Sequence, residues 1–436
     1  MNKIKSIRSY IKKSSALMLA CLMVFSFPAL AAAQEPVFPD VVSDYIVVMD
    51  ADSGEVLFSR NPDERVYPAS TTKLLTALLT VENCDLTDTV TFSEAAVGSI
   101  KAGYANASIA VGEELTVEQS LYCLILRSAN EVAYGLAEHI AGSVSSFSIL
   151  MNDKLAQLGA VNSHFTNASG LHDSTHYTTT YDMALIAQAV FNNKALMKIV
   201  GYSGIYTIPE TNKRNFIRYY RHRYQMLEGG TYEYKYSCGG KTGYTEEAGN
   251  TLVSFAQKDD LRLICVVMKG DEEARYTDTA ALFDYYFNNY TKLYVGGYDT
   301  GLGSSIDALD IVGTITGSSN ITLKTATNAY ILAPNGTDYA SLDKIITYAD
   351  SPAYVGKSGG FAVVSYYSGS KKVGDVTIYA QPTPANSVID KGEIKYINIK
   401  YILAGAGAIL VITGIIILIV KPRRKKPTYG SRNIRF

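Results

Sequence analysis

The 436-residue sequence lacks tryptophan and contains only five cysteines. The absence of tryptophan has no functional interpretation, but the scarcity of cysteine excludes a disulfide framework. Cys21 lies in an N-terminal apolar segment, and the spacing of the other four matches no zinc motif (Cys84, Cys123, Cys238 and Cys265). The His-Glu-x-x-His pattern of many zinc proteases is absent as well. We therefore expect no metal and no cofactor.

Acidic residues are absent from the first 33 positions, which carry five basic residues. An apolar run from Ala16 to Leu30 follows the basic residues and ends in small residues, the order typical of a secretory signal peptide. We expect cleavage after Ala31 or Ala33, so that residues 1–33 form the signal peptide. A lipoprotein site at Cys21 is the alternative, and the short apolar segment before it disfavours that interpretation.

Charge is absent from residues 401–420, an apolar run long enough to cross a bilayer core. A basic segment without acids, 421–436, follows directly, and the positive-inside rule places it in the cytoplasm. We expect one C-terminal transmembrane helix at 401–420, a basic cytoplasmic tail, and a body of the chain outside the membrane.

The exported part has no excess of positive charge, because it holds all 41 acidic residues but only 28 of the 40 basic ones. A surface of net negative charge repels a phosphate backbone, so nucleic acid is excluded as a partner. Topology and anionic lipids account for the basic tail.

Hydrophobic periodicity predicts an α+β domain over residues 37–291. Its expected order is a strand hairpin around Asp52-Ser53-Gly54, then helices, then strands and a final helix. The expected strands are 45–50, 56–59, 90–92, 107–111, 236–243, 250–258 and 261–269, and the expected helices begin at 70 and cover 116–126, 131–141, 145–158, 181–191 and 275–290. This order predicts an antiparallel sheet built from both ends of the segment and flanked by helices.

Helical periodicity is missing after Tyr294, where short β-prone runs alternate with turn residues. This pattern predicts a small all-β domain at 294–381. The Pro-containing stretch at 382–400 is the expected linker to the membrane helix. No nucleophile or metal cluster is evident in the β domain, which favours a spacer or interaction role.

Ser70 and Lys73 precede a strong helix-forming run. Residues three apart share a helix face, so the amine of Lys73 can reach the hydroxyl of Ser70. A lysine whose pKa is lowered can take the proton of a serine, and the N–H groups at a helix N-terminus can stabilise an oxyanion. By itself, however, a serine before a helix is usually an N-cap. We expect Ser70 to cap this helix as a secondary role.

Two further motifs complete the pattern. Ser128-Ala129-Asn130 lies between two expected helices, and Lys241-Thr242-Gly243 follows two glycines where the chain enters an expected strand. A lysine beside a hydroxyl suits recognition of a carboxylate, and glycine permits close approach of another backbone. Ser-x-x-Lys, Ser-x-Asn and Lys-Thr-Gly in this order are typical of active-site serine penicillin-interacting enzymes and class A β-lactamases.

Over residues 40–290 the chain resembles the D-alanyl-D-alanine carboxypeptidases, which are low-molecular-mass penicillin-binding proteins of serine peptidase family S11. The residues that carry the resemblance are Tyr67-Pro-Ala-Ser-Thr-Thr-Lys73, Leu126-Arg-Ser-Ala-Asn-Glu131, Asn167-Ala-Ser-Gly-Leu171, His176-Tyr-Thr-Thr, Tyr181-Asp-Met-Ala, Gly240-Lys-Thr-Gly-Tyr-Thr245 and Phe283-Asp-Tyr-Tyr-Phe287. The chain departs from the family in its full membrane span, where many members have an amphipathic helix, and in Ala129-Asn130-Glu131, where Gly-Asn-Asp is familiar.

The resemblance implies a β-lactamase/transpeptidase-like fold and removal of the terminal D-alanine from peptidoglycan stem peptides during cell-wall biogenesis. It also implies the residue roles. Ser70 attacks the carbonyl, Lys73 is its base, Ser128 relays a proton, and Asn130 holds the substrate and orients Lys73. Lys241 and Thr242 bind the terminal carboxylate, and Gly243 and Tyr244 also contact the substrate. The backbone N–H groups of Ser70 and Tyr244 form the oxyanion hole. β-Lactams acylate Ser70, and the enzyme faces the wall from the cell membrane.

Several alternatives remain open. A β-lactamase is disfavoured because no Glu-x-x-x-Asn occurs in the 160–180 region. A cross-link endopeptidase or a transpeptidase of the same fold is a further alternative, and a catalytically silent wall-binding protein is disfavoured because every reacting side chain is present. His172 and His176 could form a metal pair, but their Gly/Thr/Ser-rich surroundings favour a structural role. Glu246 and Glu247 are expected to be solvated loop carboxylates.

Overall fold

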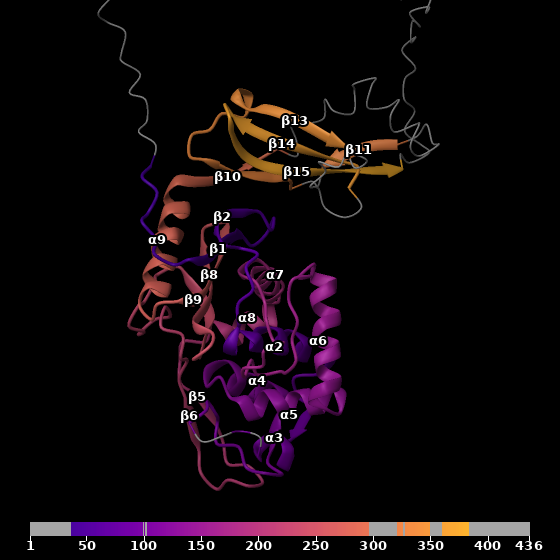
Figure 1. The fold of residues 1–436 in the computed structure, drawn as a ribbon, viewed down its shortest axis with the longest axis vertical. Coiled ribbons are helices and arrows are strands. Elements are labelled where there is room, and N and C mark those ends of the chain that lie inside the picture. The colour runs from indigo at the N-terminus through magenta and orange to yellow at the C-terminus, as the bar shows by residue number, and fades with distance from the viewer. Residues whose placement is uncertain are drawn as a thin grey trace, which may run out of the picture. The chain divides into compact units, whose positions relative to one another are not determined.

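The computed structural model describes residues 36–98, 100, 103–295, 321–325, 328–348 and 360–382 (Figure 1). The chain divides into two compact units, and the first, Met1–Ile311 with Leu323–Ala380, contains all three motifs. The expected signal peptide, membrane span and basic tail lie outside the described residues, as does the linker except for its first residue. Within the described ranges, no helix is both long and apolar enough to cross a membrane.

A five-stranded antiparallel sheet forms the centre of the fold. Its strand order is β2 (Val56–Arg60), β1 (Tyr45–Asp50), β9 (Leu261–Gly270), β8 (Gly249–Lys258) and β7 (Ser237–Thr245). Strand β1 pairs with β9 along its whole length, which joins the N-terminal hairpin to the later strands. The prediction of a sheet built from both ends of the segment is therefore confirmed.

The two faces of this sheet bury two different hydrophobic cores. In β1, Val47 and Met49 pack into the core of the central helices, whereas Ile46 and Val48 pack into a second core with α9 (Ala274–Asn289). Successive side chains of a strand point to opposite faces, so this alternation follows from the period of two. Because both faces are covered, β8 and β9 are buried along most of their length.

Helices form the larger of the two cores. They are the 3-10 helix η1 (Ala69–Thr72), α2 (Lys73–Asn83), α3 (Glu94–Gly98), α4 (Val117–Leu126), α5 (Asn130–Ala141), α6 (Val144–Leu158), α7 (Thr180–Phe191) and α8 (Lys194–Val200). The first eight residues of α2 are all buried. Thr116 begins α4 with a complete capping box, which satisfies backbone N–H groups that the first turn would otherwise leave unpaired. The six helices that the periodicity predicts are confirmed to within a few residues at each end, as α2, α4, α5, α6, α7 and α9.

The remaining strands are short or lie late in the chain (Figure 1). Strands β3 (Thr89–Thr91) and β4 (Glu114–Thr116) form one antiparallel pair, and β5 (Tyr206–Ile208) and β6 (Arg218–Tyr220) form another. The later strands are β10 (Tyr290–Tyr294), β11 (Ile321–Thr325), β12 (Tyr330–Pro334), β13 (Asp343–Tyr348), β14 (Ala362–Ser368) and β15 (Lys371–Pro382). Strand β10 pairs with β12, and the other four form a sheet of order β11-β15-β14-β13.

Two local predictions are wrong. Residues 107–111 form no strand, because side chains rather than a neighbouring strand form the hydrogen bonds to their backbone. The N–H of Ala107 donates to Glu131 Oε1 at 2.6 Å, and its carbonyl accepts from the Tyr220 hydroxyl at 2.6 Å. Ser70 is not an N-cap, since it lies inside η1 and the capping position is Pro68.

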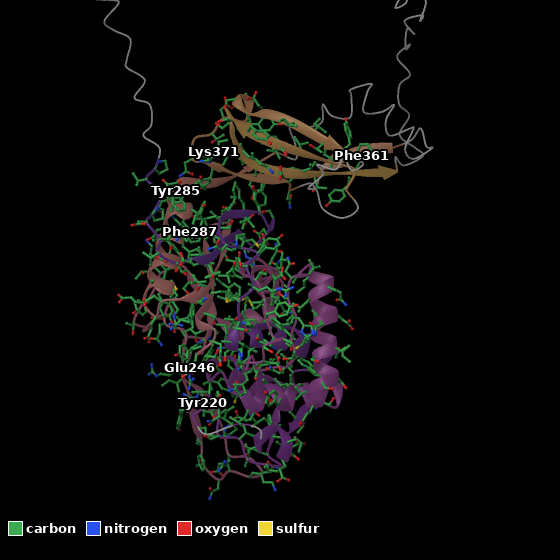
Figure 2. All side chains as sticks on the ribbon, viewed as in Figure 1. Tyr220, Glu246, Tyr285, Phe287, Phe361 and Lys371 are labelled. Atoms are coloured by element: carbon green, nitrogen blue, oxygen red, sulfur yellow. The ribbon has the colours of Figure 1, made fainter. Side chains whose placement is uncertain are left out.

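A buried ion pair supports this irregular segment. Glu113 is fully buried, and it accepts a hydrogen bond from the guanidinium of Arg218, which is only 6% exposed. The Ala110 N–H and the Thr211 hydroxyl also donate to the Glu113 carboxylate. This pair joins the loop before β4 to the β5–β6 hairpin. The side chain of Tyr220, at the end of that hairpin, is labelled in Figure 2.

Replacing Arg218 by methionine should therefore destabilise the protein strongly. Its removal leaves the buried Glu113 carboxylate with only the half-buried Arg214, 3.9 Å away, as a positively charged partner. We expect a cost of up to about 3–5 kcal/mol in the free energy of unfolding. The matched control is Lys154→Met, which removes the surface pair of Lys154 with Glu82. An exposed pair contributes about 0–1 kcal/mol. Denaturant unfolding measures both variants, and equal losses would contradict the structural role of the buried pair.

Candidate active site

Ser70 lies in a tightly held turn at the entrance to α2. Ala69, directly before it, has a φ of +48°, a left-handed conformation that is rare for a residue with a side chain. The carbonyl of Pro68 accepts hydrogen bonds from the hydroxyls of Thr71 at 2.7 Å and Thr251 at 3.1 Å. One donor comes from the turn and the other from β8, so the turn is fixed to the central sheet.

The amine of Lys73 lies at the centre of a set of oxygen atoms. Its Nζ is 3.0 Å from Ser70 Oγ, 2.7 Å from Asn130 Oδ1 and 2.6 Å from the carbonyl oxygen of Ser169. The side chain is fully buried. Burial and the neighbouring Lys241 ammonium hold the pKa of Lys73 well below its usual range. The expected reach of Lys73 to Ser70 is thus present, in surroundings that favour the neutral amine.

Ser128 and Lys241 form a second hydroxyl–amine pair. Lys241 Nζ donates to Ser128 Oγ at 3.0 Å and to the carbonyl of Thr242 at 2.7 Å. Ser128 precedes α5 with a φ of +58°, so its side chain projects from a strained position. Burial, and then the charge of Arg223, lowers the pKa of Lys241 to about 7. Two amines with lowered pKa values therefore lie in one site.

Strand β7 passes directly beside the Ser70 turn, and this explains its glycine. A Cβ atom on Gly243 would lie 2.7 Å from the backbone nitrogen of Ser70 and 2.4 Å from Thr251 Oγ1. Only a residue without a side chain permits this approach. Tyr244 follows Gly243 and is 64% exposed. Tyr244 lies in the edge strand β7, so its backbone is one residue beyond the close approach of Gly243 to the backbone nitrogen of Ser70.

A cavity of about 620 Å³ opens over these residues. Ser70, Ser128, Thr242, Gly243 and Tyr244 line it, whereas Lys73, Asn130 and Lys241 are buried behind its wall. Further lining residues are charged or titratable, namely His172, Arg223, Glu246, Glu247 and Arg275. The two glutamates are exposed, as expected of a solvated loop, but they also face the cavity; Figure 2 labels the first of them. All eight predicted site residues thus lie in or directly behind one cavity.

Sequence reasoning assigned no role to the loop at 167–170. The Ser169 carbonyl contacts Lys73, and the Asn167 side chain holds the loop by accepting from the N–H groups of Ser169 at 3.1 Å and Gly170 at 2.8 Å. Arg223, which lines the cavity and acts on the pKa of Lys241, was also missed. The Asn-Ala-Ser-Gly pattern was visible as part of the resemblance, but no periodicity marks Arg223.

His172 and His176 have different surroundings. His176 is buried, stacks on Phe165 at 4.6 Å, and has its Nε2 2.9 Å from the Thr72 hydroxyl. Its Nδ1 accepts from the Thr166 N–H at 3.0 Å, and burial lowers its pKa to about 3. His176 is therefore a neutral residue that supports the turn after Ser70. His172 instead packs edge-on against Tyr67 at the cavity rim.

A five-stranded antiparallel sheet covered by helices, with a Ser–Lys pair facing a Lys-Thr-Gly strand, defines the penicillin-binding, transpeptidase-like class of proteins. The family model described as D-alanyl-D-alanine carboxypeptidase, peptidase S11, matches residues 30–272. The chain belongs to this family.

Relatives and solved structures agree with this assignment. The chain is 32% identical to D-alanyl-D-alanine carboxypeptidase DacF of Bacillus subtilis over 250 residues, 56% of this chain and 62% of that protein. It is 33% identical to DacB2 of Mycobacterium tuberculosis over 57% of this chain and 84% of that protein. Penicillin-binding protein 5 of Haemophilus influenzae has the same fold, with a TM-score of 0.63 over 80% of this chain and 99% of that chain, at 24% identity. The matched stretch thus spans about three-fifths of the Bacillus relative.

Gly170 offers a test of how closely the 167–170 loop must approach the Ser70 turn. A Cβ atom on Gly170, which has a φ of +79°, would lie 1.8 Å from the carbonyl oxygen of Ala69. Gly159 has the same φ but nothing within 4 Å of such an atom. Both Gly→Ala variants should share the backbone strain, and only Gly170→Ala should displace Ser70, with an acylation rate about 100-fold lower.

The measurement is the rate of labelling by a fluorescent penicillin, with thermal unfolding recorded alongside. Equal labelling rates for the two variants would show that the contact with Ala69 does not position Ser70.

Proposed function

We propose that this protein is a serine-type D-alanyl-D-alanine carboxypeptidase that removes the terminal D-alanine from peptidoglycan stem pentapeptides. The observation that carries the proposal is the 3.0 Å contact between Ser70 Oγ and the buried amine of Lys73, opposite the Lys-Thr-Gly strand. Family membership supports it.

Lys73 acts as the general base. A neutral amine has two hydrogens and one lone pair, and the two hydrogens match the acceptors Asn130 Oδ1 and Ser169 O. The lone pair then faces Ser70 Oγ. As Ser70 attacks the carbonyl carbon between the two D-alanines, its proton passes to Lys73 Nζ. The lowered pKa of Lys73 makes this neutral form accessible.

The backbone N–H groups of Ser70 and Tyr244 stabilise the oxyanion of the tetrahedral intermediate. The support for this role is the close approach of Gly243 to the nitrogen of Ser70, which brings the edge of β7 to the reacting centre. Donors that are fixed before the reaction act where negative charge develops and require little reorganisation.

Ser128 relays to the nitrogen of the leaving D-alanine the proton that Lys73 took from Ser70, so that Lys73 is neutral again. The 3.0 Å hydrogen bond from Lys241 holds the Ser128 hydroxyl in place. Lys241 and Thr242 bind the terminal carboxylate, with Arg223 and Arg275 adding positive charge to the same cavity. Water then hydrolyses the ester on Ser70. A β-lactam reacts through the same first steps and leaves Ser70 acylated.

We also propose that the enzyme works outside the cell, anchored by a single span at 401–420 with its catalytic domain facing the wall. The supporting observations are the signal-peptide pattern at 1–33 and the charge-free run before the basic tail. The strands after β10 are proposed to form an all-β spacer between the catalytic domain, 37–291, and the linker.

Release of D-alanine from a D-Ala-D-Ala-terminated pentapeptide tests the activity directly. Ser70→Ala should reduce release to the uncatalysed level, whereas Ser145→Ala, at an exposed position of α6, should leave it unchanged. Wild-type protein that releases no D-alanine, or Ser70→Ala protein that releases it equally, would overturn the proposal.

The same assay separates the alternatives. Rapid turnover of a β-lactam would indicate a β-lactamase, cleavage of cross-linked dimers an endopeptidase, and transfer to an added amine a transpeptidase.

The two lysines predict a bell-shaped dependence of kcat/KM on pH. The rate should rise as Lys73 loses its proton, because a general base must be neutral. It should fall above a pH of about 7 as Lys241 loses the charge that binds the carboxylate. A substrate with a C-terminal amide has no carboxylate, so it should react more slowly and lack the alkaline fall. A fall of equal size with both substrates would exclude this role of Lys241.

A further inference from the structure

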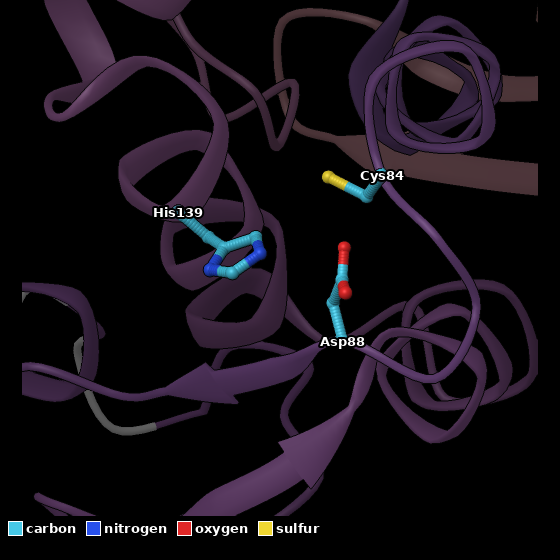
Figure 3. A group of neighbouring side chains, drawn as sticks. All are labelled: Cys84, Asp88 and His139. Atoms are coloured by element: carbon cyan, nitrogen blue, oxygen red, sulfur yellow. The ribbon is translucent and has the colours of Figure 1, made fainter.

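Three side chains with metal-binding atoms converge far from the cavity, at the opposite ends of the helices that form it. Cys84, Asp88 and His139 each offer one ligand atom, and these atoms all lie within 4.8 Å of one another. Figure 3 shows the thiol, the carboxylate and the imidazole pointing toward a common space. Cys84 and His139 are 55 positions apart in the chain, so no spacing motif in the sequence marks the three residues.

The backbone that presents Cys84 and Asp88 is firmly held. Cys84 is the C-cap of α2, and its N–H donates to the Thr80 carbonyl. In the turn that follows, the Asp85 N–H donates to Asp88 Oδ2 at 2.9 Å. The Asp88 N–H donates to the Asp85 carbonyl at 3.0 Å, and the Asp88 carbonyl accepts from Val117 at 2.8 Å. The two ligand atoms are therefore presented from an ordered turn.

His139 comes from a different helix, in the last turn of α5. Its side chain is exposed, so an ion could enter from solvent without a structural change. Both helices end near the three side chains, and a helix C-terminus carries partial negative charge that favours a cation. The two helix ends and the Asp88 carboxylate therefore all favour a bound cation.

We propose that Cys84, Asp88 and His139 form a binding site for a thiophilic divalent cation of the Zn²⁺ type. Sulfur, imidazole nitrogen and carboxylate oxygen are ligands that zinc accepts, whereas calcium and magnesium prefer oxygen alone. In a tetrahedral site, metal–ligand distances of about 2.0–2.3 Å separate neighbouring ligand atoms by roughly 3.3–3.8 Å. Small rotations of the three side chains bring the ligand atoms from separations of up to 4.8 Å to those of a tetrahedral site, and water takes the fourth position.

The bound ion joins the end of α2 to the end of α5. These helices carry Lys73 and Asn130 at their other ends, so the ion stabilises the pair of helices on which the Lys73–Asn130 contact depends. Binding replaces the proton of the Cys84 thiol by the metal and releases that proton to solvent, so affinity decreases as the pH falls. The argument for this metal site does not rest on the reaction proposed for Ser70.

Cobalt(II) is the probe, because a thiolate ligand produces a characteristic charge-transfer absorption. Reduced, chelator-treated full-length protein should bind one equivalent of Co²⁺ with this absorption, and Zn²⁺ should displace it. Cys84→Ser should abolish the band, and Asp88→Asn and His139→Gln should weaken binding about tenfold or more. Zn²⁺ should also raise the unfolding temperature of the wild-type protein but not that of Cys84→Ser.

Two matched variants complete the experiment. Cys238→Ser changes another half-buried free thiol, and Asp85→Asn changes the exposed neighbouring carboxylate of the same turn. Both should retain the band and the affinity. Absence of the band in the wild-type protein, its persistence in Cys84→Ser, or its loss in Cys238→Ser would overturn the assignment.

Discussion

The structure around the cavity depends on burying the amine of Lys73. Removing an amine from water is costly unless its hydrogens find acceptors, and here the acceptors come from three separate parts of the chain. Ser70 lies in η1, Asn130 begins α5, and Ser169 belongs to the loop before α7. The contacts that reduce the burial cost also aim the amine at the serine. Stability of the buried group and its proposed chemistry therefore have the same origin.

The buried amine of Lys241 is the second constraint on the structure around the cavity. Lys241 lies close enough to Lys73 for its charge to add to the effect of burial in lowering the pKa of Lys73, and burial lowers the pKa of Lys241 as well. Ala69 and Ser128 accept left-handed backbone conformations to bring their neighbouring side chains to this pair. Such strain persists only where the surroundings over-determine it. At Ala69, the hydrogen bonds to the Pro68 carbonyl and the close approach of Gly170 hold the backbone in this conformation.

Much of the scaffold was predictable, because long amphipathic helices and alternating strands leave a periodic signal. Element order alone predicted an antiparallel sheet built from both ends of the segment, and the structure joins those ends by pairing β1 with β9. Residues 107–111 were assigned wrongly because Glu131 and Tyr220, distant in sequence, take their backbone partners. Ser70 was assigned wrongly as a cap because sequence patterns do not distinguish a 3-10 turn from the start of an α-helix.

The sequence by itself determined the order of elements, the three motifs and the class of chemistry, because these reside in local spacing and residue type. Only the tertiary structure decided which groups surround them. The Ser169 carbonyl on Lys73, the charge of Arg223 near Lys241, and the convergence of Cys84, Asp88 and His139 join positions far apart in the chain. Contacts of this kind depend on how helices and strands pack in three dimensions, and no periodicity along the sequence records that packing.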